Sequence, residues 1–173
     1  MKSDDRRAAL IDRLADYVLA EGLSASSLRP LAKAAGLSDR MLLYYFKDKA
    51  EIMAAVLACV AVRLTTLLTA RATKTPLPLD ALRRELVAIL FAPDLWPYMR
   101  IWLEVAALSA RGDPFYRAVG EQLGRGFLGW GAAQLDCPDE EARIRDAAQL
   151  LVSIEGILFL KSIGLDDVCD AAL

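Results

Sequence analysis

Residues 38–46 have the sequence SDRMLLYYF, in which an acidic and a basic residue are followed by three apolar and three aromatic residues. At about 100° per residue on a helical wheel, Leu42 and Phe46 point to one side of this segment. The other long side chains lie opposite or beside that side: Arg40, Met41, Leu43 and Tyr44. We therefore expect a short helix that is fastened to a core by one face and presents the other face to a partner, with Tyr45 at the edge.

A second short helix is expected just before this one, over residues 28–35. Serines precede both segments, and a serine side chain is a favoured cap for the free N–H groups at a helix start. Ser26 or Ser27 can cap the first helix, and Ser38 can cap the second. Gly36 lies between them, where glycine readily ends a helix. Two short helices joined by a glycine-containing turn are typical of a helix-turn-helix, whose second helix lies in the DNA major groove.

Positive charges surround the same two segments. Arg29 lies in the first turn of the earlier helix, and Lys47 and Lys49 follow the later one. Lys49 lies at the start of the next helix, and a helix N-terminus itself attracts phosphate. A single exposed tyrosine or arginine would be ordinary on a protein surface. Because these cations and the tyrosine hydroxyls can converge on one face, we favour a surface that contacts DNA phosphates.

The region from about residue 8 to residue 60 resembles the DNA-binding region of the TetR (tetracycline repressor) family of transcriptional regulators. The resemblance is carried by SLRPLA at 27–32, AGLS at 35–38 and LLYYFKDK at 42–49. It covers about a third of the chain, and beyond it only the length and the helical pattern match. It implies an N-terminal head that binds DNA and a helical body that dimerises and holds a small-molecule effector.

The resemblance also implies which residues contact DNA. They are Ser27, Arg29, Ser38, Asp39, Arg40, Met41, Tyr44, Tyr45, Lys47 and Lys49. Arg29 and Met41 occupy base-reading positions; arginine pairs with guanine O6 and N7, whereas methionine makes apolar contact, for example with a thymine methyl. Two residues depart from the family pattern, because Leu43 replaces a phosphate-binding hydroxyl and Asp39 replaces a neutral or basic residue. We expect the DNA preference to differ from that of relatives at these two positions.

Composition excludes several other classes of function. The 173 residues include no histidine, which removes the usual general base, activator of nucleophiles and metal ligand. Cys59, Cys137 and Cys169 have no paired spacing, so neither a zinc site nor a disulfide framework is expected. We therefore expect no catalytic residues, no metal and no cofactor. With a formal net charge of −2, any contact with nucleic acid must come from a local patch.

The rest of the chain also has helical periodicity, and no segment alternates like a strand. We expect a long helix from residue 49, followed by helices over about 79–91, 95–110, 114–135 and 139–164. The predicted fold class is all-α, with a three-helix helix-turn-helix head over residues 1–50 and a helical-bundle body over 51–173. The apolar run Met53–Val62 is shorter than the roughly 20 residues of a membrane span. Since no signal-peptide pattern is present either, we expect a cytoplasmic protein without a membrane partner.

An effector site is expected where aromatic and methionine side chains gather beside two prolines, in residues 91–102. Apolar pockets with a few polar groups are the usual ligand sites. The candidate residues are Phe91, Trp96, Met99, Trp102, Glu104, Phe127 and Trp130. The aromatics could instead be ordinary core residues, because aromatics dominate cores. Glu104 and Glu155 interrupt apolar stretches, and each could bind a ligand or pair with an arginine such as Arg100.

Five of the ten glycines lie within residues 120–131, inside a helical pattern. Each costs about 1 kcal/mol relative to alanine in a helix interior, so the cluster favours close helix packing. We expect a homodimer through the last two long helices. The candidate interface residues are Gly120, Gly124, Leu151, Ile154 and Leu158. Close packing within one protomer, or a kinked helix, would explain the glycines equally well.

The leading hypothesis is a DNA-binding transcriptional regulator. It would be a repressor that binds an inverted-repeat operator in double-stranded DNA and is released by a small, mostly apolar effector. The alternative is a helical protein-interaction module without specific DNA binding. A small helical enzyme is the least favoured hypothesis, since the chain lacks histidine, a cysteine motif and a glycine-rich phosphate loop.

Overall fold

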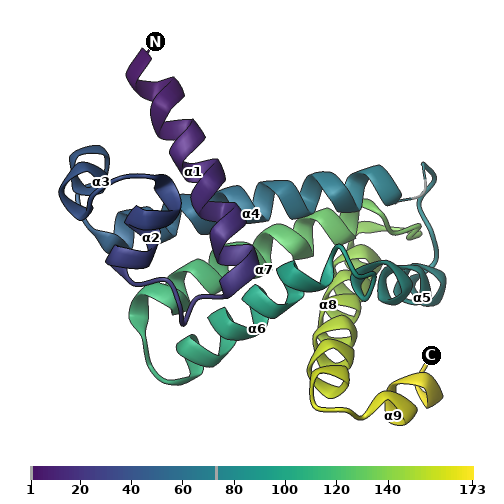
Figure 1. Cartoon of the computed structure of the whole chain (residues 1–173). Helices are drawn as coiled ribbons and strands as arrows, with labels where there is room; N and C mark the ends of the chain where they lie inside the picture. The colour runs from purple at the N-terminus through teal and green to yellow at the C-terminus, as the bar shows by residue number, and fades with distance from the viewer. Residues whose placement is uncertain (1, 73) are drawn as a thin grey trace. The chain divides into compact units, whose positions relative to one another are not determined.

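The computed structural model describes residues 2–72 and 74–173, and these residues are mostly helical (Figure 1). The helices are α1 (Lys2–Glu21), α2 (Leu28–Ala35), α3 (Asp39–Tyr45), α4 (Lys49–Arg71), α5 (Leu79–Leu90), α6 (Trp96–Ala110), α7 (Pro114–Ala133), α8 (Glu140–Ser162) and α9 (Asp166–Ala171). The predicted all-α fold class is confirmed. Within this described part, the one strand-like feature is an isolated parallel bridge between Leu77 and Leu135.

The chain separates into two compact units. Unit 1 contains Met1–Thr66 and Arg100–Gly120, and unit 2 contains Leu67–Met99 and Glu121–Leu173. The boundaries of the units fall inside α4, α6 and α7. The functional division expected at residue 50 coincides with none of them and stays a prediction.

Unit 1 begins with a long helix followed by a helix-turn-helix. α1 ends at Gly22 and α2 at Gly36, and both glycines have positive φ angles, 88° and 71°, which other residues rarely adopt. After α2, the N–H of Leu37 donates to the carbonyl of Ala32 at 2.9 Å, which closes the helix end. Ser38 then caps α3 by accepting a hydrogen bond from the N–H three residues later, as the sequence predicts.

The buried side chains of unit 1 fix the orientation of α3. Leu42 and Phe46 are 0% and 2% exposed, in agreement with the helical wheel. Further buried side chains come from the helices on either side of α3: Leu14, Val18, Leu31, Ile52, Met53, Val56 and Leu57. Burying a side chain of this size stabilises the fold by about 1.5–3 kcal/mol. The inner face of α3 is therefore committed to the core, and only its outer face is available to a partner.

Ion pairs connect α1 to α4 within unit 1. Arg63 donates to Asp12 at 2.9 Å and to Asp16 at 2.7 Å, and Arg7 donates to Glu51 at 2.7 Å. The hydrogen bond from Arg63 lowers the pKa of the Asp12 carboxyl below its ordinary value of 3.8. These pairs link α1 to the start and to the middle of α4, and so help to fix the position of α1 within unit 1.

Unit 2 is organised around α5 and α8, with α9 packed on α8. Val87 of α5, Ile157 of α8 and Cys169 of α9 form a buried cluster. Asp139 caps α8 by accepting a hydrogen bond from the N–H of Ala142 at 2.8 Å. The short helix α9 was not expected, because six residues are too few to show helical periodicity.

Among the described helices, α4 alone has the length and hydropathy of a membrane-crossing segment, and 39% of that stretch is buried. Its first half contributes Ile52, Met53 and Val56 to the buried side chains of unit 1. A core helix has the same composition, so the interpretation of α4 as a buried helix accounts for its apolar sequence.

Candidate nucleic-acid interface

The outer face of α3 exposes large apolar side chains beside a cation. Tyr44 is 78% exposed, Met41 is 43% exposed, and Arg40 also lies in solvent. The Tyr44 ring makes an edge contact with the half-buried ring of Tyr45, with centroids 5.3 Å apart. Leu43 is exposed as well, at 41%. This mixture suits the major groove, where arginine pairs with guanine and apolar groups contact thymine methyls.

The start of α2 is open to a partner. Ser27 occupies the cap position without a capping hydrogen bond, whereas Ser26 is buried and donates to the carbonyl of Gly22 at 2.7 Å. The expectation that one of these serines caps α2 through its side chain is therefore wrong. The exposed hydroxyl of Ser27 and the exposed guanidinium of Arg29 both remain available, as contact with a phosphate or a base edge requires.

Hydrogen bonds in the turn between α3 and α4 fix the backbone of Lys47 and Lys49, the two lysines expected to contact DNA. Asp48 accepts a hydrogen bond from the N–H of Glu51 at 2.8 Å, and Glu51 accepts one in return from the N–H of Lys47 at 2.7 Å. These two bonds form a capping box at the start of α4, with the return bond one residue earlier than usual. The side chains of Lys47 and Lys49 are exposed at the positive end of the α4 dipole.

Two side chains of α6, Arg100 and Glu104, hold the end of α1, and we call this pair the α6 clasp. Arg100 donates to the carbonyls of Leu19 and Ala20 at 2.6 and 2.8 Å, which are among the free carbonyls of the last helical turn. Glu104 accepts from the N–H of Leu23 at 2.7 Å and from the next N–H at 3.2 Å. The carboxylate expected to bind a ligand or an arginine is instead engaged by this loop, because backbone donors converge on it.

Gly22 fits closely against the α6 clasp. Its φ of 88° is unfavourable for any other residue, and a Cβ at this position would lie 2.7 Å from the Glu104 Oε1 atom. Glycine at the end of α1 therefore meets both a backbone and a packing requirement.

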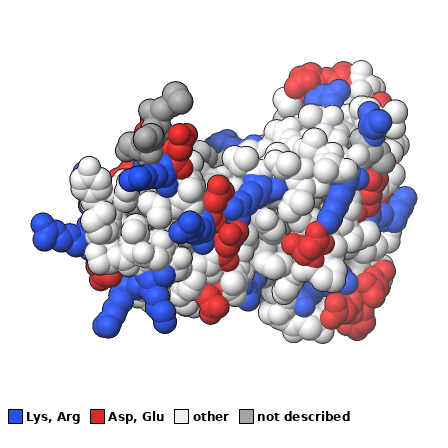
Figure 2. Space-filling model, turned by 45° about the horizontal axis from the view of Figure 1, so that its top comes forward, with Lys and Arg blue, Asp and Glu red and all other residues white. Residues whose placement is uncertain are grey.

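Charge on the surface is mixed. On the face shown in Figure 2, patches of lysine and arginine side chains lie among patches of acidic ones, in keeping with the net charge of −2. A local arrangement of cations must therefore supply the attraction to DNA, and unit 1 offers one around α2, α3 and the start of α4.

The expected effector residues are divided between the two units. In unit 2, the rings of Phe91 and Trp96 lie 5.9 Å apart, and the Lys161 ammonium lies 5.3 Å from the Phe91 centroid. Trp130 donates from Nε1 to the Thr69 hydroxyl at 3.1 Å in the same unit. The remaining candidates are one buried and two half-buried side chains: Met99, Phe127 and Trp102. Phe91 and Trp96 are thus brought together, and a ligand-binding role for the aromatic residues stays a prediction.

The exposed apolar residues of α8 differ from those expected at a dimer interface. Leu158 is 2% exposed and packs inside the protomer, while Leu151 and Ile154 are half-buried, so the expectation that Leu158 contacts a partner is corrected. The exposed apolar and small residues of α8 recur every three or four positions, and we call them the outer stripe of α8: Ile144, Ala148, Val152, Gly156 and Phe159. This spacing places them on one side of the helix.

The glycines of α7 have two kinds of surroundings. A Cβ on Gly120 or Gly131 would meet a neighbouring side chain at 3.5 or 3.4 Å, so these two glycines pack within the protomer. Gly126 and Gly129 have open space instead, and Gly124 is half-buried. Packing within a protomer therefore explains part of the cluster, and Gly126 and Gly129 leave open space beside α7.

Two sets of residues were missed from the sequence. Arg6 and Arg13 line a pocket in unit 1, and their seven-residue spacing on one helix was the available signal. Val152 and Phe159 of the outer stripe were passed over because α8 is apolar on more than one side, and periodicity alone does not tell the inner side from the outer.

Comparisons with known proteins agree with this geometry. Residues 13–56 match the family model of the bacterial regulatory proteins, tetR family, and this segment contains α2, α3 and the start of α4. A comparison with curated proteins gave no match.

Solved structures share the fold over nearly the whole chain. A protein from Rhodococcus sp. assigned to the TetR family has a TM-score of 0.70 at 19% identity, covering 99% of this chain and 95% of that one. The multidrug binding protein EbrR complexed with proflavin has a TM-score of 0.69 at 20% identity, with coverages of 97% and 99%. A protein from Saccharomonospora viridis assigned as a transcriptional regulator, in complex with choline, has a TM-score of 0.60 at 18% identity, with coverages of 93% and 87%. At these identities the likeness is one of fold.

The family match falls on the segment that forms the helix-turn-helix, and the fold of the whole chain is the one that TetR-family proteins share. The chain therefore carries a TetR-type helix-turn-helix DNA-binding segment over residues 13–56, and it shares its overall fold with these solved proteins.

Proposed function

We propose that this regulator is a repressor that acts in the cytoplasm as a homodimer on an inverted-repeat operator and leaves it when a small, mostly apolar effector binds. The observation that carries operator reading is the outer face of α3, where Arg40, Met41 and Tyr44 are exposed while Leu42 and Phe46 anchor the helix. A protein gains nothing for its own fold by exposing a tyrosine and a methionine side by side, so a partner surface is the simplest reason for them.

The proposed contacts divide into base reading and backbone positioning. Arg29 and Met41 read base edges, and Asp39 accepts from a cytosine amino group or disfavours a nearby phosphate. The hydroxyls and ammonium groups position the head on phosphates: Ser27, Ser38, Tyr44, Tyr45, Lys47 and Lys49. Arg40 extends from the same face as Tyr44 and contacts either a base edge or a phosphate.

The outer stripe of α8 supports the dimer. Val152 and Phe159 are 73% and 56% exposed, which is unusual for large apolar residues spaced along one side of a helix. Ala148 and Gly156 lie beside them and allow a second helix to approach closely. In a two-fold dimer the same stripe meets itself, and two heads related by that axis read two half-sites of an inverted repeat.

Effector binding is supported by relatives in fold and by side chains of unit 2. EbrR holds proflavin and the Saccharomonospora viridis protein holds choline in their crystals. Here the paired rings of Phe91 and Trp96 offer an aromatic surface, which favours an effector with an apolar body. The effector releases DNA only to the extent that it binds a DNA-incompetent conformer better than a competent one.

The operator test is a selection from duplexes with randomised inverted repeats, followed by gel shifts of the winning sequence and a scrambled duplex of equal length. We expect the full chain to prefer the selected repeat by about 10³-fold or more at moderate salt. Tyr44→Ala should weaken binding to both duplexes by a similar factor, whereas Tyr116→Ala, in α7, serves as a tyrosine control and should leave both affinities unchanged. Equal affinity of the wild type for all duplexes would overturn specific operator binding and favour a protein-interaction module.

Repression and release are tested with a reporter gene behind the selected operator and with a panel of small molecules. We expect lower reporter expression when the regulator is present, and recovery with compounds that raise its melting temperature. Activation of the reporter would contradict repression. A compound that stabilises the protein without weakening operator binding would not qualify as the effector.

A further inference from the structure

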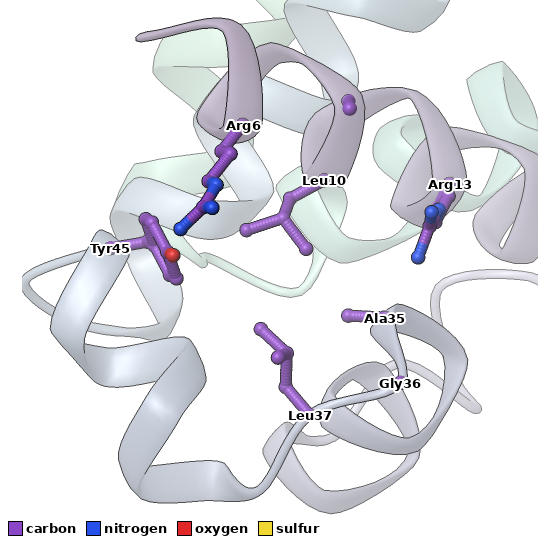
Figure 3. A pocket seen from close by; sticks show the side chains of 8 residues that line it. Arg6, Leu10, Arg13, Ala35, Gly36, Leu37 and Tyr45 are labelled. Carbon is purple, nitrogen blue, oxygen red and sulfur yellow. The ribbon is translucent and has the colours of Figure 1, made fainter. Parts of the chain in front are cut away.

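A pocket of about 320 Å³ lies between α1 and the turn that joins α2 to α3 (Figure 3). Its lining combines two arginines, aliphatic side chains and one tyrosine ring, among them Arg6, Leu10, Arg13, Leu37 and Tyr45. Figure 3 shows Arg6 and Arg13 extending from α1 toward the pocket, with the guanidinium of Arg6 directed toward the ring of Tyr45. The pocket thus has apolar walls and a basic rim.

The two arginines at the rim have no direct ion-pair partner among the described residues. Among the described residues, neither Arg6 nor Arg13 forms an ion pair or a side-chain hydrogen bond, and both are exposed. Two other arginines of unit 1 behave differently, because Arg7 pairs with Glu51 and Arg63 pairs with two aspartates of α1. Positive charge left free beside an apolar cavity raises the local concentration of anions.

The spacing of the arginines suits an extended anion. Arg6 and Arg13 are seven residues apart, which places them on the same side of α1 about 10 Å apart along its axis. The phosphates of one DNA strand advance by about 3.4 Å per nucleotide along the duplex axis. Two guanidiniums at this separation reach phosphates a few nucleotides apart on one strand.

Tyr45 joins the pocket to the outer face of α3. Its side chain lines the pocket on one side and meets the ring of Tyr44 on the other, with centroids 5.3 Å apart. Tyr44 is the most exposed of the large apolar and aromatic side chains of α3. The pocket is therefore continuous with the face proposed to enter the major groove.

We infer that this pocket is a second DNA contact, in which Arg6 and Arg13 bind backbone phosphates of one strand beside the groove that α3 enters. The inference rests on the proposed operator binding. DNA is favoured over a free organic anion because the cations are exposed, are spaced for an extended polyanion and adjoin the recognition helix. Such contacts add affinity and salt dependence without adding base preference.

The test measures binding of the full-chain Arg6→Gln/Arg13→Gln double variant to the selected operator and to the scrambled duplex over a series of salt concentrations. We expect the slope of log affinity against log salt to become shallower by about 0.9 for each phosphate that the variant no longer binds. The affinity should fall by the same factor on both duplexes. Arg84→Gln/Arg111→Gln removes the same charge from exposed positions of α5 and of the turn after α6, and should leave the slope unchanged.

Each outcome has a definite meaning. An unchanged slope in the double variant, with the wild type still selecting its operator, would overturn the phosphate site and leave the proposed function standing. Failure of the wild type to select any operator would instead overturn the proposed function. A thermal shift by benzoate that only the double variant loses, with an unchanged DNA slope, would assign the pocket to a small organic anion and overturn the inference. Unchanged melting of the double variant controls for folding.

Discussion

The outer faces of α3 and α8 both expose large apolar side chains, yet their surroundings suit different partners. On α3, Met41 and Tyr44 lie on a seven-residue helix with cations before and after it. On α8, Val152 and Phe159 lie along a 23-residue helix, and the neighbouring positions of the same stripe hold alanine and glycine. Cations beside an apolar group favour DNA, whereas small residues between apolar groups favour a second helix. An exposed apolar residue is therefore best interpreted from its neighbours.

The largest expected effect is on the dimer. Val152→Asp places a charge in the outer stripe of α8, and burying a valine is worth about 1.5–3 kcal/mol. Because a two-fold axis repeats the site, the dimer should lose about 3 kcal/mol or more, which raises its dissociation constant by at least about 100-fold. Sedimentation equilibrium measures this constant. Val62→Asp on the exposed side of α4 is the matched control, and equal behaviour of the two variants would contradict the proposed interface.

The two faces of α3 itself provide the next contrast. Leu42→Ala should destabilise the fold by about 2–5 kcal/mol, because it leaves a cavity in the core. Leu43→Ala removes the same atoms from a side chain that is 41% exposed, and should change stability by no more than about 0.5 kcal/mol. Urea unfolding followed by circular dichroism compares them. Similar losses for both would mean that α3 is rotated from the orientation described.

A smaller effect separates base reading from backbone contact. Arg29→Ala should cost about 1–3 kcal/mol on the selected operator and relax the preference at one base pair of each half-site. Lys49→Ala should weaken binding to every duplex by a similar factor. Affinities for operators with single base-pair changes distinguish the two. If Arg29→Ala weakened binding equally to all these operators, Arg29 would contact the DNA backbone and not a base.

The smallest effect concerns the α1–α4 ion pairs. The hydrogen bond from Arg63 lowers the pKa of Asp12 in the folded protein, so between the folded and unfolded values the unfolded chain binds more protons. The stabilisation is complete above the ordinary value of 3.8 and is lost as the pH falls through the lowered value. Asp12→Asn should therefore lose stability near neutral pH and converge with the wild type in acid. Urea unfolding at several pH values tests this, and a gap that widens in acid would contradict it.

Local patterns in the sequence were sufficient for most of the fold and for the outer face of α3. The helical wheel separates Leu42 from Tyr44, and the ends of α2 and α3 follow from Gly36 and Ser38, because each depends on residues within one or two helical turns. The two adjacent serines before α2 predicted a side-chain cap that is absent, because Ser26 is buried and donates to Gly22 while Ser27 makes no capping hydrogen bond.

Other features depend on residues far apart in the chain. Glu104 bonds to a loop 80 and 81 positions earlier, and no local spacing signals that partner. The inner and outer sides of α8 are decided by what α5 covers, so Leu158 and Phe159, adjacent in sequence, differ completely in exposure. Distant packing, which periodicity does not encode, accounts for these errors.

The α6 clasp limits how the head can be transplanted. A fragment of residues 1–66 keeps α3 and its cations but lacks Arg100 and Glu104, so two carbonyls of α1 and two N–H groups of the following loop lose their partners. A chimaera that exchanges only the head would place a foreign loop after α1 against the original Glu104 carboxylate. The residue at position 22 of that loop would also have to be glycine, because Gly22 leaves no room for a side chain. Exchangeable modules in this protein are therefore discontinuous, and a working graft moves α6 together with the head it anchors.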